Sequence, residues 1–516
     1  LPRVKKFEKK YNQEKIDKYI QSIEAELEEL DYNDPKDKRK IVSREQKISN
    51  IKAGIFTTKK EQELIRPINL GSSVDLPALM YSEEGFHFEV IKNNESGKPS
   101  TDEETLTNLR LTVKKPDSPK AIFLDRLLEL RGLEKMYKTY IEGWNEKVQD
   151  DDRLHGRFLI HGTTSGRLSS AEPNAQQIPK TSVDPNIKLQ LKAPKGTLYI
   201  ASDFSQAELR IMAHLSGDET YLNAFNSGQD PHLAIAATKY HIPYEEALKI
   251  YEDENHPEHK IWKVRRKQAK QIAFGLIYGI GAKLLAVKLS DPKSGIIVTP
   301  EEAQKEMDIF FGQHPKLKTF LKKQEKFLRK NGHLVSLFGR KRRLPQIYSN
   351  DKGEEAYALR LALNFPCQSA ASDMCLFGSI LIYYLMRQGK LPSTKSVCLV
   401  HDANYQITKP ENINIWSIYE MWQIYRNPLT KPYFGFQIDD VTMDMEFVIG
   451  RSMAEELPFI PGYDYKKMLE PDFSVEEYME EHKKYKHIPI SEYKKRFNKQ
   501  MKQYEEDFKR THGMES

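Results

Sequence analysis

The chain has 516 residues, of which 39% are hydrophobic and 30% charged, and its formal net charge is +6. This composition excludes an intrinsically disordered chain and predicts a large protein of several domains or subdomains. The sequence shows no uninterrupted apolar run of 18 residues and no signal peptide, so we expect no membrane span. Its three cysteines form no CxxC pair, which argues against a disulfide framework or a thiolate zinc site.

The N-terminal part is mainly helical in pattern. Residues 1–65 and 120–145 carry apolar side chains at helical spacing among Lys and Glu. Between them lies a polar loop at 90–105, where Ser100 and Thr101 precede two glutamates. That arrangement is typical of a capped helix start, so a third helix is predicted there.

The pattern changes from about residue 156. Strand-like runs at Arg157–His161 and Thr197–Ala201 are followed by a long helical stretch over 216–345 and a helix near 355–387. The tail from 460 is highly charged. It contains an apolar stripe at helical spacing, which we expect to pack against the rest of the chain: Tyr493, Phe497, Met501, Tyr504 and Phe508.

Basic residues gather in two segments of the central region. Residues 259–270 contain six Lys or Arg and no acid, and residues 339–343 contain four in five positions. Basic clusters are usually solvated faces, but two in one region favour a phosphate-bearing partner.

A hairpin with a charged tip is predicted at 396–408. The runs Val397–Val400 and Tyr405–Thr408 read as strands, which places His401 and Asp402 at or near the turn. Aspartate is common in turns because its side chain bonds nearby backbone groups. From this segment alone Asp402 is therefore either a turn residue or a ligand.

A second carboxylate lies at another strand end. Asp203 follows the strand-like run Leu198–Ala201 and precedes an amphipathic helix. Ser205 can cap that helix, which leaves Asp203 free to point elsewhere. Two carboxylates at strand ends can meet at one edge of a sheet and bind Mg²⁺, which prefers oxygen ligands.

One helix in the basic region carries four notable side chains. Arg266, Lys270, Phe274 and Tyr278 are four residues apart and form one slowly drifting stripe on a helix. Two cations followed by two aromatic rings suit a nucleotide, with charge for a triphosphate and flat rings for sugar and base. An aromatic core face with solvated cations explains the same spacing, so this segment alone leaves both interpretations open.

Five segments together resemble the signature motifs of family A DNA polymerases, the bacterial DNA polymerase I and phage replicative type. The likeness extends upstream to "INLGSSVDLPALMY" and "KPSTDEETL" and covers roughly residues 65–455. The five segments, in order, are "TTSGRLSSAEPNAQQIP" (163–179), "DFSQAELR" (203–210), "RRKQAKQIAFGLIYG" (265–279), "NFPCQSAASD" (364–373) and "LVHDA" (399–403).

The resemblance implies an α+β right-hand fold, with an antiparallel palm sheet and helical fingers and thumb. It also implies a polymerase module without the exonuclease domain, and the initial Leu suggests a fragment of a longer product. The implied domains are a thumb region with an N-terminal helical segment (1–155), palm (156–215), fingers (216–345), palm again (346–455) and a charged C-terminal helical extension (456–516).

The resemblance also assigns roles to residues. Asp203 and Asp402 match the aspartates that hold two catalytic Mg²⁺ ions, for which Mn²⁺ can substitute, and Lys270 joins them as a catalytic residue. The expected nucleotide-binding residues are Arg266, Lys270, Phe274, His232, Gln206, Glu208 and Tyr278. The expected primer–template contacts are Arg167, Asn174, Gln176, Arg360, Asn364, Gln368 and His401.

The implied reaction is template-directed DNA synthesis, in which a deoxyribonucleotide joins the primer 3′-hydroxyl and pyrophosphate leaves. Glu208 matches the family's steric gate and would crowd a ribose 2′-hydroxyl against Phe274. The phenylalanine at 274, where some relatives carry tyrosine, predicts poor use of dideoxynucleotides.

Two positions depart from the family's pattern. Ala403 stands where many relatives carry glutamate, and Ala273 where they commonly carry asparagine. Rival interpretations are a single-subunit RNA polymerase or reverse transcriptase, and a catalytically inactive subunit that binds primer–template. Expected partners are primer–template DNA, deoxyribonucleotides and other replication proteins or an upstream exonuclease, helicase or primase. We expect a monomer in the cytoplasm of a bacterium or phage-infected cell, or in an organelle.

Overall fold

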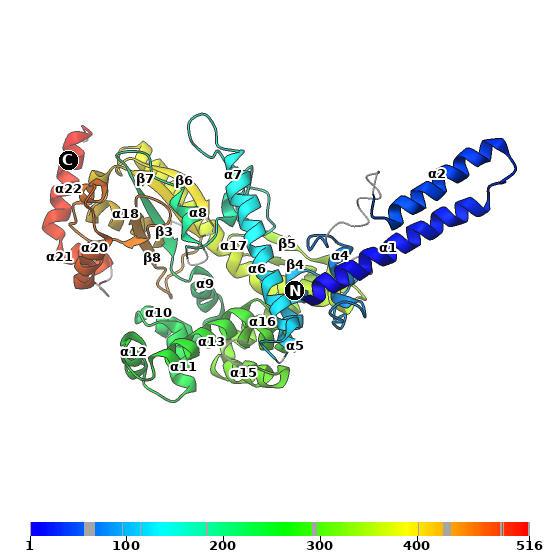
Figure 1. The fold of residues 1–516 in the computed structure, drawn as a ribbon. Coiled ribbons are helices and arrows are strands. Elements are labelled where there is room, and N and C mark those ends of the chain that lie inside the picture. The colour runs from blue at the N-terminus through cyan, green and yellow to red at the C-terminus, as the bar shows by residue number, and fades with distance from the viewer. Residues whose placement is uncertain are drawn as a thin grey trace. The chain divides into compact units, whose positions relative to one another are not determined.

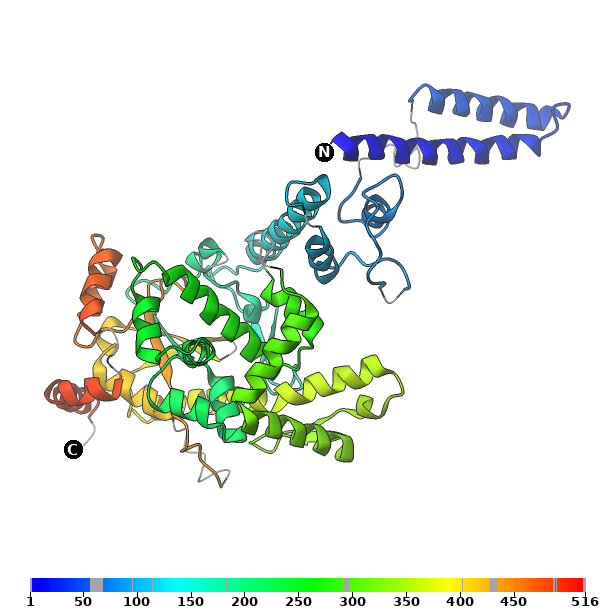
Figure 2. The ribbon, with the colours of Figure 1, turned by 90° about the horizontal axis from the view of Figure 1, so that it is seen from below.

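The protein is described from a computed structural model (Figures 1 and 2). It divides into two compact units, Leu1–Tyr137 and a second unit that begins at Lys138. We describe each unit by itself. The described residues are 2–55, 68–94, 96–113, 115–181, 184–290, 297–400, 402–426, 435–485, 488 and 490–513.

The first unit is helical, as its sequence predicts. Its first two helices form a hairpin in which Ile16, Ile20 and Ile23 share one face and pack near Ile51. A separate apolar core joins the next three helices. The helices are α1 (Pro2–Glu28), α2 (Pro35–Lys52), α4 (Asp75–Tyr81), α5 (Glu103–Thr112) and α6 (Pro119–Met136).

The start of α5 corrects one sequence prediction. Its N-cap is Asp102, whose carboxylate accepts a hydrogen bond from the Thr105 amide at 2.7 Å. Ser100 instead accepts a bond from the amide of Asp102 at 3.2 Å. The predicted cap at Ser100 and Thr101 was therefore wrong, because the helix begins one residue later than that pattern requires.

The second unit is built on an antiparallel five-stranded sheet with the order β6-β7-β3-β8-β9. Along the central strand, Leu198 and Ile200 face the main core, whereas Tyr199 and Ala201 face a smaller cluster on the other side. The strands are β3 (Leu198–Phe204), β6 (Thr394–Val400), β7 (Ala403–Thr408), β8 (Met445–Gly450) and β9 (Leu457–Pro458).

The predicted hairpin at 396–408 is confirmed by β6 and β7. A bulge between Ser396 and Cys398 shifts its register. A two-stranded ladder, β1 (Arg157–Leu159) with β2 (Ser169–Ala171), precedes the sheet. The short helices α7 (Gly143–Asn145) and α8 (Pro185–Leu189) lie in the same part of the chain.

Consecutive helices follow α9 and lie together beside one end of the sheet (Figure 1). The prediction of a helical stretch over 216–345 holds as far as Asn331. It is wrong beyond, because Gly332, with φ of 65°, ends the last helix and a hairpin of β4 (His333–Val335) and β5 (Lys341–Arg343) follows. The helices are α9 (Ala207–Ser216), α10 (Glu219–Asn226), α11 (Pro231–Lys239), α12 (Tyr244–Glu252), α13 (His259–Ile277), α14 (Ala282–Leu289), α15 (Pro300–Gln313) and α16 (Pro315–Asn331).

The predicted helix near 355–387 is α17 (Lys352–Arg387), which runs beside α9 and α18 (Ile415–Arg426). By length and composition alone, it is the one helix among the described residues that could cross a membrane. Several of its side chains, including Phe365, Ala370 and Met374, are instead buried in this unit's cores. Burial of these side chains in the cores accounts for part of its apolar composition.

The charged tail packs onto α18, as its apolar stripe predicts. Tyr493 and Met501 are buried in the main core, and the ring of Phe508 lies 4.9 Å from that of Trp416. The tail helices are α20 (Val475–His482), α21 (Ile490–Arg496) and α22 (Asn498–Thr511). The two units are coarser than the predicted palm, fingers and thumb boundaries, which stay predictions.

Candidate active site

The sheet brings the two predicted aspartates together. Strands β3 and β7 are antiparallel neighbours, and Asp203 pairs with Ala403, the residue directly after Asp402. Asp203 is the one exposed side chain on an otherwise buried strand. The two carboxylates are 199 positions apart in the sequence (402 − 203), and the pairing of their strands places both at the same end of the sheet.

The helix after β3 starts later than its sequence indicates. Gln206 is the N-cap of α9, in the left-handed conformation with φ of 57° and no side-chain cap bond. The prediction that Ser205 caps this helix was therefore wrong. Asp203 nevertheless does not cap it, because Asp203 belongs to β3 itself.

Asp203 is exposed at its side chain, but it lies at a partly desolvated strand end next to other acids. Desolvation first, and then the charges of Asp402 and Glu446, raise its pKa to about 7. Glu446 lies on β8 directly opposite Asp203 and is exposed. This end of the sheet therefore concentrates negative charge in a setting that favours bound cations.

A chain of hydrogen bonds links this acidic end to two helices. Arg167 donates to Asp402 at 3.3 Å and to Glu208 at 2.6 Å. The hydroxyl of Tyr278 donates to the other oxygen of Glu208 at 2.5 Å. Glu208 is buried, so hydrogen bonds from these two donors, of which only Arg167 is charged, take the place of water around its carboxylate.

The predicted stripe on α13 is confirmed as one helical face that ends at the C-cap residue Tyr278. The Lys270 ammonium lies 5.8 Å from the centre of the Phe274 ring. The rings of Phe274 and Tyr278 stack at 6.2 Å with an angle of 17° between their planes. Arg266 bonds the carboxylate of Asp230 at 2.6 Å.

His232 lies behind this stripe, with its ring 5.7 Å from that of Phe274. It is buried, and neither ring nitrogen has a hydrogen-bond partner among the described residues. Burial, followed by the charges of Arg266 and Lys270, lowers its pKa to about 4 against the opposing effect of Asp230. The imidazole is therefore neutral near pH 7 and keeps one N–H to donate.

Three predicted primer–template residues share one face of α17. Arg360, Asn364 and Gln368 are spaced four apart, and Arg360 is exposed with its guanidinium 6.0 Å from the Tyr357 ring. The turn after α13 packs directly on this face. A Cβ at Gly279, which has φ of 68°, would lie 3.2 Å from the Arg360 Cα, so this approach requires glycine.

Two further predicted DNA contacts, Asn174 and Gln176, lie in the loop between β2 and β3. The Asn174 side chain accepts a bond from the Gln176 amide at 3.0 Å, and Gln176 donates to the Leu399 carbonyl of β6. This loop is thereby attached to the hairpin that carries Asp402. His401 lies outside the described residues.

Sequence reasoning missed two acids at the site, Asp230 and Glu446. Asp230 is two residues before His232 and had no motif of its own, so only the packing of α11 against α13 reveals its bond to Arg266. Glu446 follows the alternation of β8, but its place opposite Asp203 depends on the pairing of distant strands.

The ligand atoms at the site suit a divalent metal such as Mg²⁺. Among the described residues no cluster of three or more acidic, histidine or cysteine side chains could hold a metal by itself. Asp203 and Asp402 supply oxygen ligands only, which suits Mg²⁺ because water and phosphate complete its coordination.

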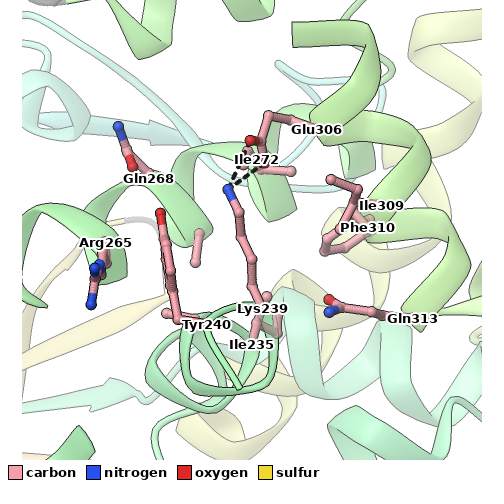
Figure 3. Close-up of a pocket in the computed structure, with 12 residues that line it drawn as sticks. Ile235, Lys239, Tyr240, Arg265, Gln268, Ile272, Glu306, Ile309, Phe310 and Gln313 are labelled. Carbon is pink, nitrogen blue, oxygen red and sulfur yellow. Dashed lines mark hydrogen bonds and ion pairs between the residues drawn. The ribbon is translucent and has the colours of Figure 1, made fainter. Parts of the chain in front are cut away.

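A small cavity of about 20 Å³ lies between α11, α13 and α15 (Figure 3). By helical spacing, the α13 residues that line this cavity are on the opposite face of the helix from the stripe. Its lining includes Arg265 and Gln268, and Lys239 of α11 bonds Glu306 of α15 across it at 2.7 Å. The cavity has room for about one water molecule and includes none of the predicted site residues.

Comparisons with known proteins connect this geometry to one family. The model of DNA polymerase family A matches residues 38–415, a range that contains every predicted site residue. "DNA polymerase I, thermostable" from Thermus aquaticus is 32% identical over 319 residues, which are 61% of this chain and 35% of that protein. DNA polymerase I from Pseudomonas aeruginosa is 32% identical over 336 residues, which are 65% of this chain and 33% of that protein.

A solved structure is also similar. It is the POL domain of Pol1 from M. smegmatis in complex with DNA primer-template and dNTP, with a TM-score of 0.61 and 29% identity over 76% of this chain and 62% of that one. The chain spans about a third of the length of the curated relatives that it matches, 35% and 33% for the two named above.

Proposed function

This chain belongs to DNA polymerase family A, and from that premise we propose that it extends a DNA primer along a template by adding deoxyribonucleotides. The observation that carries the proposal is that Asp203 and Asp402 lie on neighbouring strands at the same end of the sheet, in the same unit as the stripe on α13. The POL domain similar to this chain was solved with primer-template and dNTP. Those ligands are the partners that we propose here.

Asp203 and Asp402 would hold two Mg²⁺ ions, with Mn²⁺ as a substitute. Bound there, the ions supply activation of the primer 3′-oxygen and stabilisation of the charge that develops on the phosphoryl group and the leaving pyrophosphate. The raised pKa of Asp203 supports this role, because burial and neighbouring acids disfavour its ionised form and a bound cation would stabilise that form.

The stripe on α13 would hold the incoming nucleotide. Lys270 is exposed and is placed to bind the triphosphate, while Arg266 must exchange Asp230 for phosphate oxygens. His232 is neutral near pH 7 and can donate its N–H to a phosphate once the packing around it opens. These residues neutralise and orient the triphosphate, which is their contribution to phosphoryl transfer.

Glu208 and Phe274 would exclude ribonucleotides. Bonds from Arg167 and Tyr278 hold the Glu208 carboxylate in one place. A buried carboxylate fixed in this way would leave no room for a 2′-hydroxyl, the group that distinguishes ribose from deoxyribose. Deoxyribonucleotide selection therefore follows from the fixed position of this side chain rather than from a separate binding contact.

Primer extension tests the proposal and its rivals together. We expect the wild-type chain to extend a DNA primer on a DNA template with deoxyribonucleotides and Mg²⁺, and Asp402→Asn to bind the same duplex without extending it. Preference for ribonucleotides would favour an RNA polymerase, and extension on RNA templates alone a reverse transcriptase. Binding without any extension by the wild-type chain would favour an inactive subunit and would refute the proposal.

A further inference from the structure

Helix α16 carries an unusual excess of positive charge. Its sequence contains seven Lys or Arg and one acid, Glu325. Leu317, Phe320, Leu321 and Leu328 are buried on one face. The opposite face, which we name the α16 lysine face, consists of four exposed residues: Lys322, Lys323, Lys326 and Lys330.

Stability of the helix does not explain this face. Like charges four residues apart, as at Lys322, Lys326 and Lys330, repel and weaken a helix. The acids beside it are already engaged, since Arg329 bonds Glu325 at 2.9 Å and Glu355 at 2.6 Å. None of the four lysines of the face bonds an acid among the described residues.

Neighbouring residues extend the basic surface and add an aromatic ring. Phe327 is 44% exposed, and its ring meets His333 edge-on at 5.9 Å. His333 pairs with Arg343 across the β4–β5 hairpin, where Arg343 and Lys341 are both exposed. An exposed ring among cations is the arrangement that binds single-stranded nucleic acid, because the bases stack while the phosphates are neutralised.

We propose that the α16 lysine face binds the unpaired template strand ahead of the primer terminus, an inference that rests on the proposed function. Lys322, Lys326 and Lys330 follow one another at about 6 Å along the helix axis, so one strand laid along the helix reaches all three. The bond of Arg329 to Glu355 holds α16 beside the half of α17 that carries Arg360. An unpaired strand fits better than a duplex because only its bases can stack on Phe327.

The first test measures oligothymidylate binding over a range of salt. Lys322→Ala, Lys326→Ala and Lys330→Ala are combined in one variant. The control combines Lys495→Ala, Lys499→Ala and Lys502→Ala on the exposed side of the tail helices, away from α16 in both views (Figures 1 and 2). We expect the α16 variant to reduce the slope of log affinity against log salt by about 2, from about 0.7 for each lost phosphate contact. Equal slopes for the two variants would overturn the proposal.

A second test uses Phe327→Ala, which removes the exposed ring and no charge. It should weaken oligothymidylate binding several-fold with the salt slope unchanged. Equal weakening on a blunt duplex would overturn the assignment to an unpaired strand, and unchanged binding would overturn the stacking role.

Primer extension by the wild-type chain on a short template overhang separates this inference from the proposed function. That reaction does not need the α16 lysine face, so its absence would refute polymerase activity itself. If it proceeds while the overhang adds nothing to wild-type affinity, only the template-binding inference fails. We expect a long overhang to raise wild-type affinity, and to do so much less in the α16 variant.

Discussion

Asp203 and Asp402 lie on neighbouring strands at one end of the sheet, and among the described residues Arg167 bonds Asp402 while no cation bonds Asp203. On α13 the cations are balanced differently, since Arg266 already bonds Asp230 while Lys270 is free of acids in the described part of the chain. The sheet end therefore holds excess negative charge, and the helix holds partly neutralised positive charge.

The difference indicates two ways of preparing for a ligand. At the sheet end, desolvation and then the nearby acids raise the pKa of Asp203, so a metal ion bound there would relieve an unfavourable negative charge. On α13, a triphosphate bound as proposed would have to replace Asp230 as the partner of Arg266, which would reduce the net gain from that residue. Each side can be tested by removing its own charge.

The largest expected effects follow from removing one charge at the sheet end or one charge on α13. Asp203→Asn and Lys270→Ala should each slow primer extension by about a thousandfold or more, because the first removes a proposed metal ligand and the second a proposed cationic contact to the triphosphate. Mn²⁺ binding to the DNA-free protein, measured by electron paramagnetic resonance, should be lost in Asp203→Asn alone. Loss of Mn²⁺ binding in Lys270→Ala would show that the two sides are not independent.

Phe274→Tyr examines the aromatic half of the stripe. The added hydroxyl can bond the nucleotide where a dideoxynucleotide lacks its own 3′-hydroxyl, so discrimination against dideoxynucleotides should fall by about tenfold or more. Termination ladders from primer extension measure the change. The substitution leaves the proposed metal ligands Asp203 and Asp402 unchanged, so the metal dependence of the reaction should be the same in wild type and variant.

The pH dependence of metal binding reports on the sheet end. Asp203 must lose its proton to bind Mg²⁺, and its pKa is raised to about 7. Mg²⁺ affinity of the DNA-free protein should therefore fall by up to about tenfold for each pH unit below 7, and level off above it. Isothermal titration calorimetry at several pH values measures this, and proton release on binding should be largest at low pH.

The same raised pKa has a consequence for stability. The native state binds this proton more tightly than the unfolded chain, so the stability that it contributes is present below about pH 4 and is lost as pH rises to about 7. Asp203→Asn removes the titration, and its thermal stability relative to wild type should increase over that range. A constant difference in melting temperature across the range would contradict the raised pKa.

Local spacing was enough to predict the stripe on α13 and the β6–β7 hairpin, because both depend on residues close in the chain. The meeting of Asp203 with Asp402 depends on the pairing of β3 with β7 across half of the second unit. Residue types suggested that this was feasible, but only the family resemblance selected these two acids. Pattern alone does not specify which distant strands pair.

Partners made by tertiary packing could not be predicted. The bond of Asp230 to Arg266 and the burial of His232 depend on how α11 lies against α13. The overextended helical prediction near β4 and β5 has a different cause, because the glycine that ends α16 is a local stop signal present in the sequence. Side-chain partners at this site thus follow from the packing of whole helices rather than from any motif.

The smallest expected effect concerns the partner of Arg266. Asp230→Asn removes the acid's charge but keeps an amide oxygen that can still cap α11 by accepting from the Leu233 amide. With Arg266 released, nucleotide affinity in the presence of primer–template should rise by roughly two- to fivefold, the range expected for a partly exposed ion pair. Glu306→Gln is a matched control, because its ion pair with Lys239 has the same 26% exposure on both side chains. That control removes a similar charge from the far side of α13, so an equal gain in both variants would mean that general electrostatics, and not the release of Arg266, sets nucleotide affinity.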